Sequence, residues 1–334
     1  MTGLYTDEVL DTLRVGAAGL LGTWGLSPDA RVTLLNISEN ATFLAREAGA
    51  DPTSDDTIVL RVYRPGYHTR QEIESELDWI TDLRAHHVVD TPEPLAVAGG
   101  GHIATFALNG DHRAVAAFAF MSGAEPSPDT DLTGNFHTLG AISARLHAHA
   151  RAWTRPQGFR RKTWTWDTTV GPTPHWGDWR AAMGLEPAGA AVLARACRVL
   201  RARLEAHGTG PDRFGLIHAD LRLANLLVEG DRLGVIDFDD CGFGWFGYDF
   251  AAAVSFLEHE PYIPDLQDAW VAGYRTVAPL RAEEEAMLPT FVMLRRVLLT
   301  AWLASHAETP TAQELGAPYT DGTVDLAERF LGTS

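Results

Sequence analysis

Residues 215–249 read GLIHADLRLANLLVEGDRLGVIDFDDCGFGWFGYD. Two short, largely apolar runs in this stretch flank a polar loop and are predicted to form strands. Asp220 and Asn225 lie in the loop, and Asp237 lies in the second run. If the two strands pair around the loop, these three polar side chains converge on one place.

The three residue types suit one kind of chemistry. Phosphoryl transfer needs a carboxylate near the acceptor hydroxyl, and it needs oxygen donors that hold magnesium against the phosphates. Mg²⁺ is a hard cation that prefers oxygen ligands and usually binds one or two protein groups together with phosphates. Asp220, Asn225 and Asp237 supply such a set. The stretch therefore predicts Mg²⁺-dependent phosphoryl transfer.

The order of motifs extends this interpretation to a family. The spacing His-x-Asp-x-x-x-x-Asn at 218–225, the triplet Ile-Asp-Phe at 236–238 and the run Tyr-Asp-Phe-Ala at 248–251 resemble the aminoglycoside phosphotransferase and choline kinase-like family. These proteins are small-molecule relatives of the protein kinases. The pair Asp239-Asp240 and the turn at 36–40 look nearest to the type II homoserine kinases and bacterial stress-response kinases. The resemblance covers most of the chain.

The resemblance implies a role for each matching residue. Asp220 would be the catalytic base, while Asn225 and Asp237 would hold Mg²⁺. Arg222 occupies a position where protein kinases often place a basic residue that contacts the γ-phosphate. The surrounding residues would support the site: His218 as part of the motif, Asp249 by bracing the loop through hydrogen bonds, and Asp240 by orienting the acceptor or by capping a glycine turn.

The nucleotide side of the sequence departs from the kinase pattern. Protein kinases place a lysine on the third strand, paired with a helix glutamate, to hold the nucleotide phosphates. Lys162 is the only lysine among the 27 basic residues, and it lies far along the chain from that strand. Arg61 stands in the strand instead, with Glu76 on the following helix as its acid and Glu72 as the competing partner. Arginine stays charged and can hold phosphate oxygens with two nitrogens, so we expect Arg61 to bind ATP. The alternative is an exposed strand arginine, with another group binding phosphate.

Three further positions are candidates on the nucleotide side. The turn at 38–42 contains no glycine, so backbone N–H groups and the side chain of Ser38 or Asn40 would meet a phosphate there. Adenine would bind the backbone near residues 119–121, at the end of a predicted strand that closes with Met121. Because backbone atoms make that contact, side-chain identity says little about it.

The hydrophobic pattern predicts two lobes. Residues 1–124 predict a small antiparallel sheet with one long helix over it. The expected strands are 32–37, 41–45, 57–63, 95–98, 103–108 and 114–121, and the expected helices are 7–21, with Thr6 as its cap, and 70–84. In residues 125–334 we expect helices at 133–153, 187–207, 248–258, 264–276, 282–306 and 321–331, with strands at 216–218 and 233–238. The predicted class is α+β: a protein-kinase-like bilobal fold, with a nucleotide-binding N-terminal lobe and a larger helical C-terminal lobe that carries catalysis and the substrate.

Composition limits the partners. Acidic residues outnumber basic residues by 44 to 27, a formal net charge of −17 at pH 7. This excess argues against a nucleic-acid binder with a basic patch and disfavours anionic membrane surfaces. Two cysteines cannot form a disulfide framework or a structural zinc site, and the N-terminal residues lack the apolar run of a signal peptide. We therefore expect a cytoplasmic protein, and the sequence does not indicate its oligomeric state.

Two other patterns have competing interpretations. The run GFGWFG at 242–247 formally matches the dinucleotide-binding fingerprint. Three nearby aspartates would crowd a pyrophosphate, and no parallel strand follows, so we expect the glycines to shape a short segment instead. Five of the ten tryptophans lie between residues 153 and 180. They favour packing of an irregular insert, with an aromatic wall for a substrate ammonium as the alternative.

These observations predict a kinase that transfers the γ-phosphoryl group of ATP to a hydroxyl of a small molecule. An acidic cleft would suit an amino-bearing acceptor, such as an amino alcohol, an amino acid or an amino sugar. The alternatives are a protein Ser/Thr kinase of the stress-response type and a non-catalytic nucleotide-binding protein. Arg61 and the missing glycine-rich loop favour the non-catalytic alternative, whereas the intact set of Asp220, Asn225 and Asp237 opposes it.

Overall fold

The computed structural model describes residues 6–37, 40–49, 57–307 and 309–332, and the chain divides into two compact units. The first unit contains residues 1–124, 154–161 and 234–239. The second contains residues 125–153, 162–233 and 240–334.

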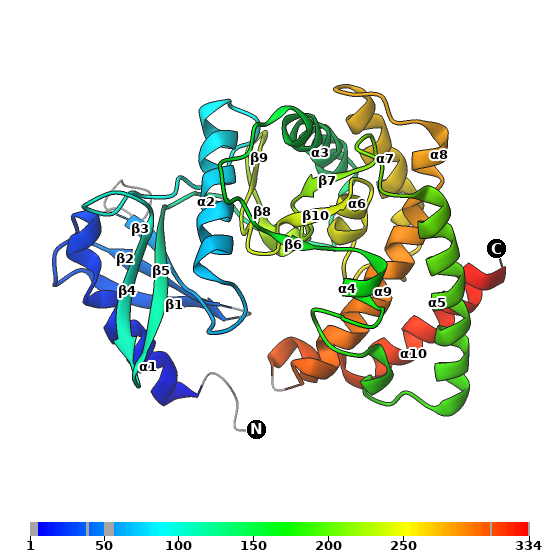
Figure 1. Cartoon of the computed structure of the whole chain (residues 1–334), viewed down its shortest axis with the longest axis horizontal. Coiled ribbons are helices and arrows are strands. Elements are labelled where there is room, and N and C mark those ends of the chain that lie inside the picture. The colour runs from blue at the N-terminus through cyan, green and yellow to red at the C-terminus, as the bar shows by residue number, and fades with distance from the viewer. Residues whose placement is uncertain (1–5, 38–39, 50–56, 308, 333–334) are drawn as a thin grey trace. The chain divides into compact units, whose positions relative to one another are not determined.

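A five-stranded antiparallel sheet forms the centre of the first unit (Figure 1). Its strands, in the spatial order β1-β2-β3-β5-β4, are β1 (Arg31–Ile37), β2 (Ala41–Arg46), β3 (Thr57–Val62), β5 (Asp111–Ala119) and β4 (Ile103–Leu108). The strand predicted at 95–98 is wrong, because only an isolated bridge between Pro94 and Phe118 forms there. Gly99, Gly100 and Gly101 all have positive φ angles and turn the chain at this point, so the extended segment cannot continue.

Helix α1 (Asp7–Ala18) covers one face of this sheet. Its N-cap is the predicted Thr6, whose hydroxyl accepts a hydrogen bond from the N–H of Val9 at 3.3 Å. The helix ends earlier than predicted and is followed by a 3-10 turn, η1 (Leu21–Trp24). Apolar side chains of α1 and of the strands bury one another in a common core. This burial is the main source of stability for the small sheet.

Strand β3 has two buried faces with different chemistry. Ile58, Leu60 and Val62 join the core that is shared with α1. Because side chains alternate along a strand, Arg61 points to the opposite face, where its guanidinium carbon lies 5.1 Å from the ring centre of Phe118 on β5. The strand therefore carries one charged side chain into the interior of the unit.

Helix α2 (Arg70–Ala85) lies on the side of the sheet to which Arg61 points, and an ion pair between Arg61 and Glu76 joins the helix to the sheet. It begins at a capping box in which Thr69 and Glu72 bond each other's backbone N–H groups. Trp79 on α2 is fully buried and meets Phe238 edge-to-face at 5.5 Å between ring centres. This contact attaches the segment that contains Asp237 to the first unit.

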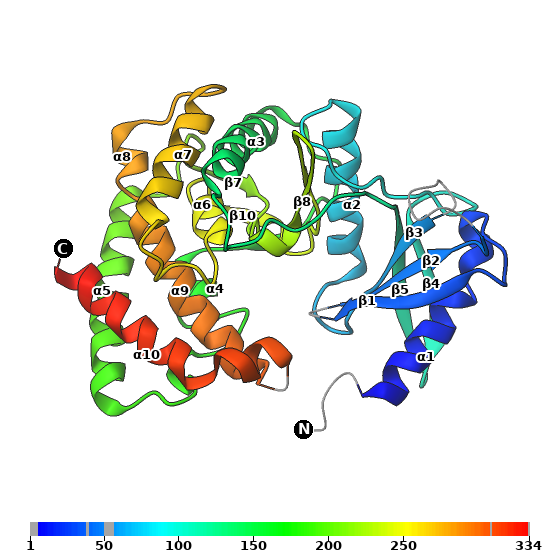
Figure 2. The same ribbon diagram turned by 180° about the vertical axis from the view of Figure 1, so that it is seen from behind.

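Helices make up most of the second unit (Figure 2). They are α3 (Thr133–Ala152), α4 (Trp166–Thr169), α5 (Pro187–His207), α6 (Tyr248–Ala253), α7 (Ile263–Arg275), α8 (Ala282–Glu285), α9 (Leu288–Ser305) and α10 (Pro310–Gly332), with a 3-10 turn, η2 (Trp179–Ala181). The single helix predicted at 282–306 is wrong, because α9 starts afresh with Pro289 in its first turn. Proline has no N–H to donate and suits only that first turn. The helix predicted at 248–258 is shorter than expected, and α10 is longer and kinks at Gly316.

Two glycines allow α3 and α7 to cross closely. A Cβ atom on Gly140 of α3 would lie 2.0 Å from the carbonyl oxygen of Trp270. A Cβ atom on Gly273 of α7 would lie 1.8 Å from the carbonyl oxygen of His137. Neither distance is possible for real atoms, so the crossing requires glycine at both positions.

The dinucleotide-like run forms a strand rather than a phosphate-binding turn. Gly242–Trp245 is β10, which pairs in parallel with β6 (Lys162–Thr163) and antiparallel with β7 (Phe214–Ile217). A Cβ atom on Gly242 would lie 2.5 Å from the carbonyl oxygen of Lys162, so the glycine permits close pairing. β10 and β6 are absent from the predicted elements. The predicted strands at 216–218 and 233–238 correspond to β7 and to β9 (Arg232–Val235), and β9 pairs with β8 (Leu226–Glu229).

The tryptophan-rich insert is largely interior. Trp164, Trp176 and Trp179 are 1%, 5% and 2% exposed. The rings of Trp164 and Trp176 meet edge-to-face at 5.2 Å. These three side chains therefore pack the insert, as the favoured interpretation predicts.

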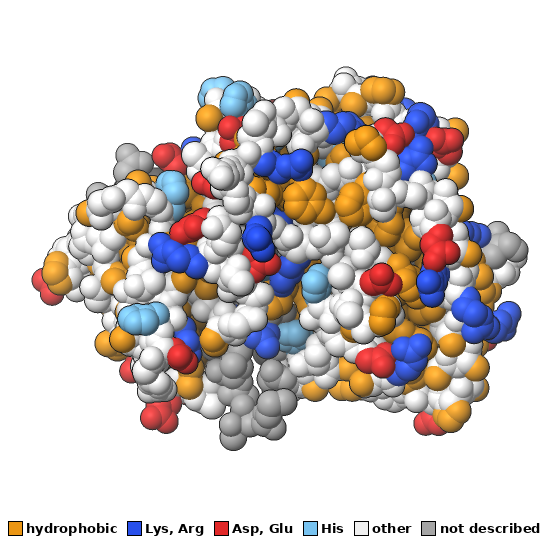
Figure 3. Space-filling model, in the orientation of Figure 1, with side chains coloured by type: hydrophobic (Ala, Val, Ile, Leu, Met, Phe, Trp, Pro, Cys, Tyr) orange, Lys and Arg blue, Asp and Glu red, His pale blue; other side chains and the backbone are white. Residues whose placement is uncertain are grey.

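Among the described residues, one helical stretch has the length and composition of a membrane span. The stretch Ala282–Ser305 is long and apolar enough to cross a membrane, but 72% of its most apolar window is buried, as in the core helix of a globular protein. On the face drawn in Figure 3, basic and acidic side chains are intermingled.

Candidate active site

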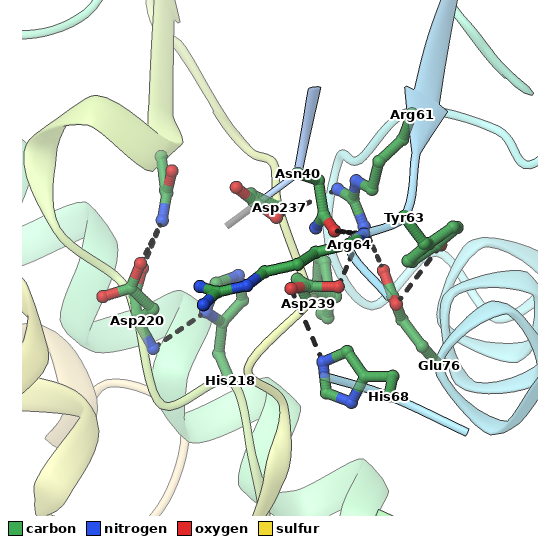
Figure 4. Close-up of polar contacts among 12 residues, drawn as sticks. Asn40, Arg61, Tyr63, Arg64, His68, Glu76, His218, Asp220, Asp237 and Asp239 are labelled. Carbon is green, nitrogen blue, oxygen red and sulfur yellow. Dashed lines mark hydrogen bonds and ion pairs between the residues drawn. The ribbon is translucent and has the colours of Figure 1, made fainter. Parts of the chain in front are cut away.

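A buried ion pair joins the sheet and the helix of the first unit (Figure 4). Nη1 of Arg61 lies 2.5 Å from Oε1 of Glu76 on α2, and the Glu76 side chain has no exposed surface. The hydroxyl of Tyr63 lies 3.5 Å from the other oxygen of Glu76. Glu72 instead accepts a hydrogen bond from the N–H of Thr69 at 2.7 Å. The structure thus pairs the strand arginine with the predicted acid and leaves Glu72 to cap the helix.

Arg61 also contacts the segment that follows β9 (Figure 4). Its Nη2 donates to Oδ1 of Asp237 at 3.0 Å, and its Nη1 lies 4.0 Å from Oδ1 of Asp239. Oδ2 of Asp239 lies 3.5 Å from Nε2 of His68. The side chain of Asp237 is 36% exposed, whereas that of Asp239 is 7% exposed. Arg61 is therefore surrounded by three carboxylates, of which Asp237 is the one that is open to a ligand.

The charges around Asp239 and Glu76 have different effects on the two carboxyl groups. Burial alone would raise the pKa of Asp239, but the facing side chains of His68, Arg61 and Arg161 outweigh burial and hold that pKa well below its usual range. Burial raises the pKa of Glu76, and Arg61 only partly opposes this rise. Arg161 also donates to the carbonyl oxygens of Glu72, at 2.8 Å, and of Asp239. Asp239 is thus an ionised counter-charge for Arg61 and its neighbours.

The other nucleotide-side candidates have structural contacts. Asn40 is buried, and its Oδ1 accepts a hydrogen bond from the N–H of Arg64 at 3.0 Å. A phosphate would therefore meet the amide nitrogen of Asn40 rather than its oxygen. Ser38 lies outside the described residues. Met121 packs on the chain that leads to Asp237, because a Cβ atom on Gly234 would lie 2.7 Å from its sulfur.

In the second unit, the loop between β7 and β8 holds Asp220 through its own side chains. Oδ2 of Asp220 accepts a hydrogen bond from Nδ2 of Asn225 at 2.7 Å and from Nε of Arg222 at 3.3 Å. The N–H of Asp220 donates to Nδ1 of the fully buried His218 at 3.2 Å. Burial alone would raise the pKa of Asp220, but Arg295, Arg222 and His218 outweigh it and lower that pKa. Asp220 is therefore a fixed and ionised carboxylate.

The donor atoms of the loop suit a hard divalent cation. Nδ2 of Asn225 donates to both the side chain and the carbonyl oxygen of Asp220, at 2.7 and 2.8 Å, so its Oδ1 is the atom available to a metal. Asp237 offers a partly exposed carboxylate. Amide and carboxylate oxygens are the ligands that Mg²⁺ prefers. The set thus fits Mg²⁺, although Asn225 and Asp237 belong to different units and their convergence on one ion stays a prediction.

Asp249 on α6 braces the loop, as predicted from the family pattern. Its Oδ1 accepts a hydrogen bond from the N–H of Ala219 at 2.7 Å, and its Oδ2 accepts one from the N–H of His218 at 3.3 Å. Ala219 has a φ of 66°, in the left-handed region that costs a non-glycine residue about 1–2 kcal/mol. Two hydrogen bonds donated by backbone N–H groups to one charged carboxylate hold this strained turn in place.

His147 on α3 completes the brace. Its Nε2 lies 3.0 Å from Oδ2 of Asp249, and its Nδ1 lies 3.2 Å from the hydroxyl of Tyr274 on α7. All of these contacts are buried. Burial lowers the pKa of His147, and Asp249 opposes this only in part.

Folding stability should therefore depend on pH through His147. Its pKa is lowered in the folded chain but ordinary, about 6.5, in the unfolded chain. Below pH 6.5 the unfolded chain takes up a proton that the folded chain refuses, so we expect the free energy of unfolding to fall as pH decreases from 6.5 toward the folded pKa, by at most about 1.4 kcal/mol per pH unit. Urea unfolding at several pH values should show this slope reduced in His147→Gln. It should be unchanged in His86→Gln, which alters an exposed histidine; equal slopes in all three proteins would refute the assignment.

Arg295 on α9 is the main contact that the sequence predictions missed. Its Nη2 lies 2.5 Å from Oδ1 of Asp220. The signal was present in the sequence: Arg295 and Arg296 stand together inside the otherwise apolar run 288–303. Arginines inside a buried helix must be paired, but the sequence does not say with which acids. The structure assigns Asp220 to the first and Glu258, at 2.8 Å, to the second.

The predicted supporting residue Asp240 follows the charged segment of the first unit but belongs to the second. It is 8% exposed, and its carbonyl oxygen accepts a hydrogen bond from Nε1 of Trp164 at 2.9 Å. Burial raises the pKa of Tyr248, and the carboxylates of Asp220 and Asp240 add to the rise although Arg295 opposes it. The field around Tyr248 therefore includes two negative groups.

Comparison with known proteins identifies the family. Residues 33–284 match the model of a family described as the phosphotransferase enzyme family, and this match spans most of the chain. The chain belongs to the phosphotransferase enzyme family.

Three known proteins are similar to this chain over most of its length. A microcompartment-associated aminopropanol kinase is 46% identical, with 95% of this chain and 97% of that protein covered and a TM-score of 0.87. A homoserine kinase of Gluconobacter oxydans is 26% identical, with 91% of this chain and 92% of the relative covered. An amicoumacin kinase, solved with AMP-PNP, Ca²⁺ and Ami, is 19% identical, with 96% and 94% covered and a TM-score of 0.75, and it shows the likeness of fold.

These comparisons confirm three predictions. The resemblance to the aminoglycoside phosphotransferase and choline kinase-like family is correct, and so is the α+β, protein-kinase-like fold class. The phosphotransferase is an enzyme of the kinase class that acts on an alcohol group, as expected. The similar aminopropanol kinase and homoserine kinase are both small-molecule kinases.

Proposed function

We propose that this phosphotransferase uses ATP and Mg²⁺ to phosphorylate the hydroxyl group of a small amino alcohol. The observation that carries the proposal is Asp220, a carboxylate bound at both oxygens in the loop where the family motif places the catalytic base. The 46% identity to an aminopropanol kinase, over nearly all of both chains, supports an amino alcohol as the acceptor.

Each charged residue has a task in this reaction. Asp220 would orient the acceptor hydroxyl and receive its proton as the oxygen–phosphorus bond forms. Arg61 would bind the nucleotide phosphates with the nitrogens that now meet Asp237 and Glu76, and Arg222 would face the γ-phosphate. Asn225 and Asp237 would hold Mg²⁺, which offsets the charge of the phosphates when it is bound. Catalysis of this kind works mainly by positioning and electrostatics.

The charges near Asp220 favour an ammonium group over a carboxylate on the acceptor. Arg222 and Arg295 both contact Asp220, and Arg295 also donates to Ser255, at 3.0 Å. A carboxylate on the acceptor would need a cation whose N–H donors are not already engaged. It would also be repelled by the negative charges of Asp220 and Asp240. An ammonium is attracted by the same charges, and we assign its binding to Asp240.

A panel of acceptors tests this specificity. With saturating MgATP, we expect kcat/KM for 1-aminopropan-2-ol to exceed that for homoserine by about 100-fold, equivalent to about 2.7 kcal/mol of transition-state stabilisation. Ethanolamine should be a weaker but measurable acceptor, because it keeps both the ammonium and the hydroxyl. Asp240→Asn should raise KM for the amino alcohols more than it lowers kcat.

Other outcomes of the same panel point elsewhere. A preference for homoserine would overturn the amino-alcohol assignment while leaving the kinase activity. Phosphorylation of serine in a protein substrate, with none of the small acceptors modified, would favour the protein Ser/Thr kinase alternative. Tight ATP binding without turnover of any acceptor would favour the non-catalytic alternative. A small polar acceptor of this kind agrees with the expected cytoplasmic location, which stays a prediction.

A further inference from the structure

Arg295 is a buried cation at the centre of the second unit. It lies on α9, whose other residues are mostly apolar, and it is 1% exposed although its side chain is charged. Its guanidinium donates to four groups: Oδ1 of Asp220 at 2.5 Å, Oγ of Ser255 at 3.0 Å, the carbonyl oxygen of Ala219 at 3.3 Å and the hydroxyl of Tyr248 at 3.4 Å. An unpaired charge would not be tolerated at such a position, so these contacts are what keeps Arg295 there.

The four contacts come from different parts of the chain. Ala219 and Asp220 belong to the loop after β7, while Tyr248 lies on α6 and Ser255 follows that helix. The guanidinium carbon also lies 5.1 Å from the ring centre of Trp176, at a distance typical of a cation–π contact. Arg295 is thus in contact with α6, the turn that follows α6 and the insert, and it offers two nitrogens, Nη1 and Nη2, to the loop.

The contact with Asp220 completes the binding of that carboxylate. Asn225 and Arg222 occupy Oδ2, and Arg295 occupies Oδ1. Asn225 and Arg222 belong to the same short loop as Asp220 and would move with it. Arg295 is the contact from outside the loop, on an 18-residue helix of the core. Rotation of the carboxylate would break a short charged hydrogen bond to a rigid element.

We propose that Arg295 is a positioning residue, which fixes the direction of the Asp220 carboxylate so that it meets the acceptor hydroxyl. This inference rests on the proposed function, because it assigns Asp220 to the acceptor. Arg295 acts through Asp220, and its own donors are directed at protein groups. An acceptor-orienting carboxylate gains most when its geometry is set before the substrate arrives.

The helix offers a matched control. Arg296, the next residue, is 2% exposed and is equally committed, with donor contacts to Glu258 at 2.8 Å and to Thr323 at 2.8 Å. Both arginines are buried cations of one core helix, but of the two only Arg295 pairs with Asp220, whereas Arg296 pairs with Glu258. Loss of either charge should destabilise the unit, because it leaves a buried acid without its partner. Only the loss of Arg295, and not that of Arg296, should also change the direction in which the Asp220 carboxylate points.

The test is a double-mutant cycle in the full-length chain with 1-aminopropan-2-ol and MgATP. We expect Arg295→Met to lower kcat by about 100-fold, with KM for both substrates within about threefold of the original values, because a misdirected group affects the chemical step more than binding. Arg295→Lys keeps the charge but can bond fewer of the four groups, so it should restore about a tenth of the original kcat. Arg296→Met should change kcat by less than about threefold.

The cycle separates positioning from structural support. In an Asp220→Asn background, Arg295→Met should lower the residual rate by less than about threefold, because the carboxylate that Arg295 directs is gone. An equal loss of rate in both backgrounds, or a loss in Arg296→Met as large as in Arg295→Met, would overturn the proposal. If Arg295→Met does not fold, the comparison of Arg295→Lys in the two backgrounds decides in the same way.

The failure of the proposed function has a different signature. If the unmodified protein transfers phosphate to no amino alcohol, the proposed function is overturned, and the task of Arg295 in that reaction falls with it. The contact itself is measured independently by urea unfolding of the same four proteins. We expect the shifts in unfolding midpoint for Arg295→Met and Asp220→Asn to be non-additive. Additive shifts would show that the two side chains do not interact and would overturn the positioning proposal whatever the activity.

Discussion

Replacement of Asp220 by asparagine is expected to reduce phosphoryl transfer to an amino alcohol by at least about 1,000-fold, because no other carboxylate in the loop can receive the hydroxyl proton. The amide keeps the shape of the side chain but carries no charge. Arg61 and Glu76, the residues proposed to bind nucleotide, belong to the other unit. We therefore expect the dissociation constant of MgATP, measured by calorimetry, to change by less than about threefold.

The controls for this prediction concern stability and position. Asp220→Ala should lose activity to a similar extent but unfold at lower urea concentration, because it leaves the buried Arg295 without its acid. Asp212→Asn changes an exposed aspartate that bonds Arg281 at 2.7 Å, and it should keep the original rate. Transfer by Asp220→Asn within tenfold of the original rate would remove Asp220 from the catalytic role.

Replacement of Arg61 by methionine is expected to have the second largest effect. Glu76 would be left buried without its arginine partner. Asp237 and Asp239 would lose the positive charge that contacts both of their carboxylates. We expect kcat/KM for ATP to fall by about 100-fold or more, and the free energy of unfolding to fall by about 3–5 kcal/mol, the usual consequence of removing one partner of a buried ion pair. Initial-rate assays at varied ATP concentration measure kcat/KM, and urea unfolding measures the free energy of unfolding.

Two variants show whether the effect belongs to this site. Arg61→Lys keeps the charge but cannot bond two separated carboxylates in the same way, so it should fall between the original protein and the methionine variant. Arg31→Met removes an exposed arginine of β1 and should leave both measurements unchanged. An Arg61→Met protein with unchanged ATP dependence would support the alternative in which another group binds phosphate.

Patterns local in sequence predicted much of the fold. The loop with Asp220 and Asn225 lies between short strands as expected, and the five-stranded sheet carries Arg61 on its third strand. The failures occur where pairing joins distant segments. β6 and β10 are two and four residues long and pair across about 80 positions of the chain. Such strands leave almost no periodic signal, because their hydrogen bonds depend on partners that the local sequence does not contain.

The same distinction applies to the candidate site. The resemblance to the kinase family was enough to single out Asp249, and the choice of Glu76 over Glu72 agrees with the ion pair in the structure. Motif spacing could not single out Arg295 or His68. Arg295 contacts Asp220 and His68 contacts Asp239, and in both pairs the two residues lie far apart in the sequence. An arginine within an apolar helical run indicates only that it needs a partner for its charge. Which carboxylate it meets is decided by the packing of the helices.

The most direct test of the central claim is the stoichiometry of the reaction of the purified protein with MgATP and 1-aminopropan-2-ol. ADP and the phosphorylated amino alcohol are measured together by mass spectrometry, with and without EDTA. We predict one phosphorylated acceptor for each ADP formed, and no product of either kind when EDTA removes Mg²⁺. ADP formation without a phosphorylated acceptor, or an unchanged yield in EDTA, would contradict the account.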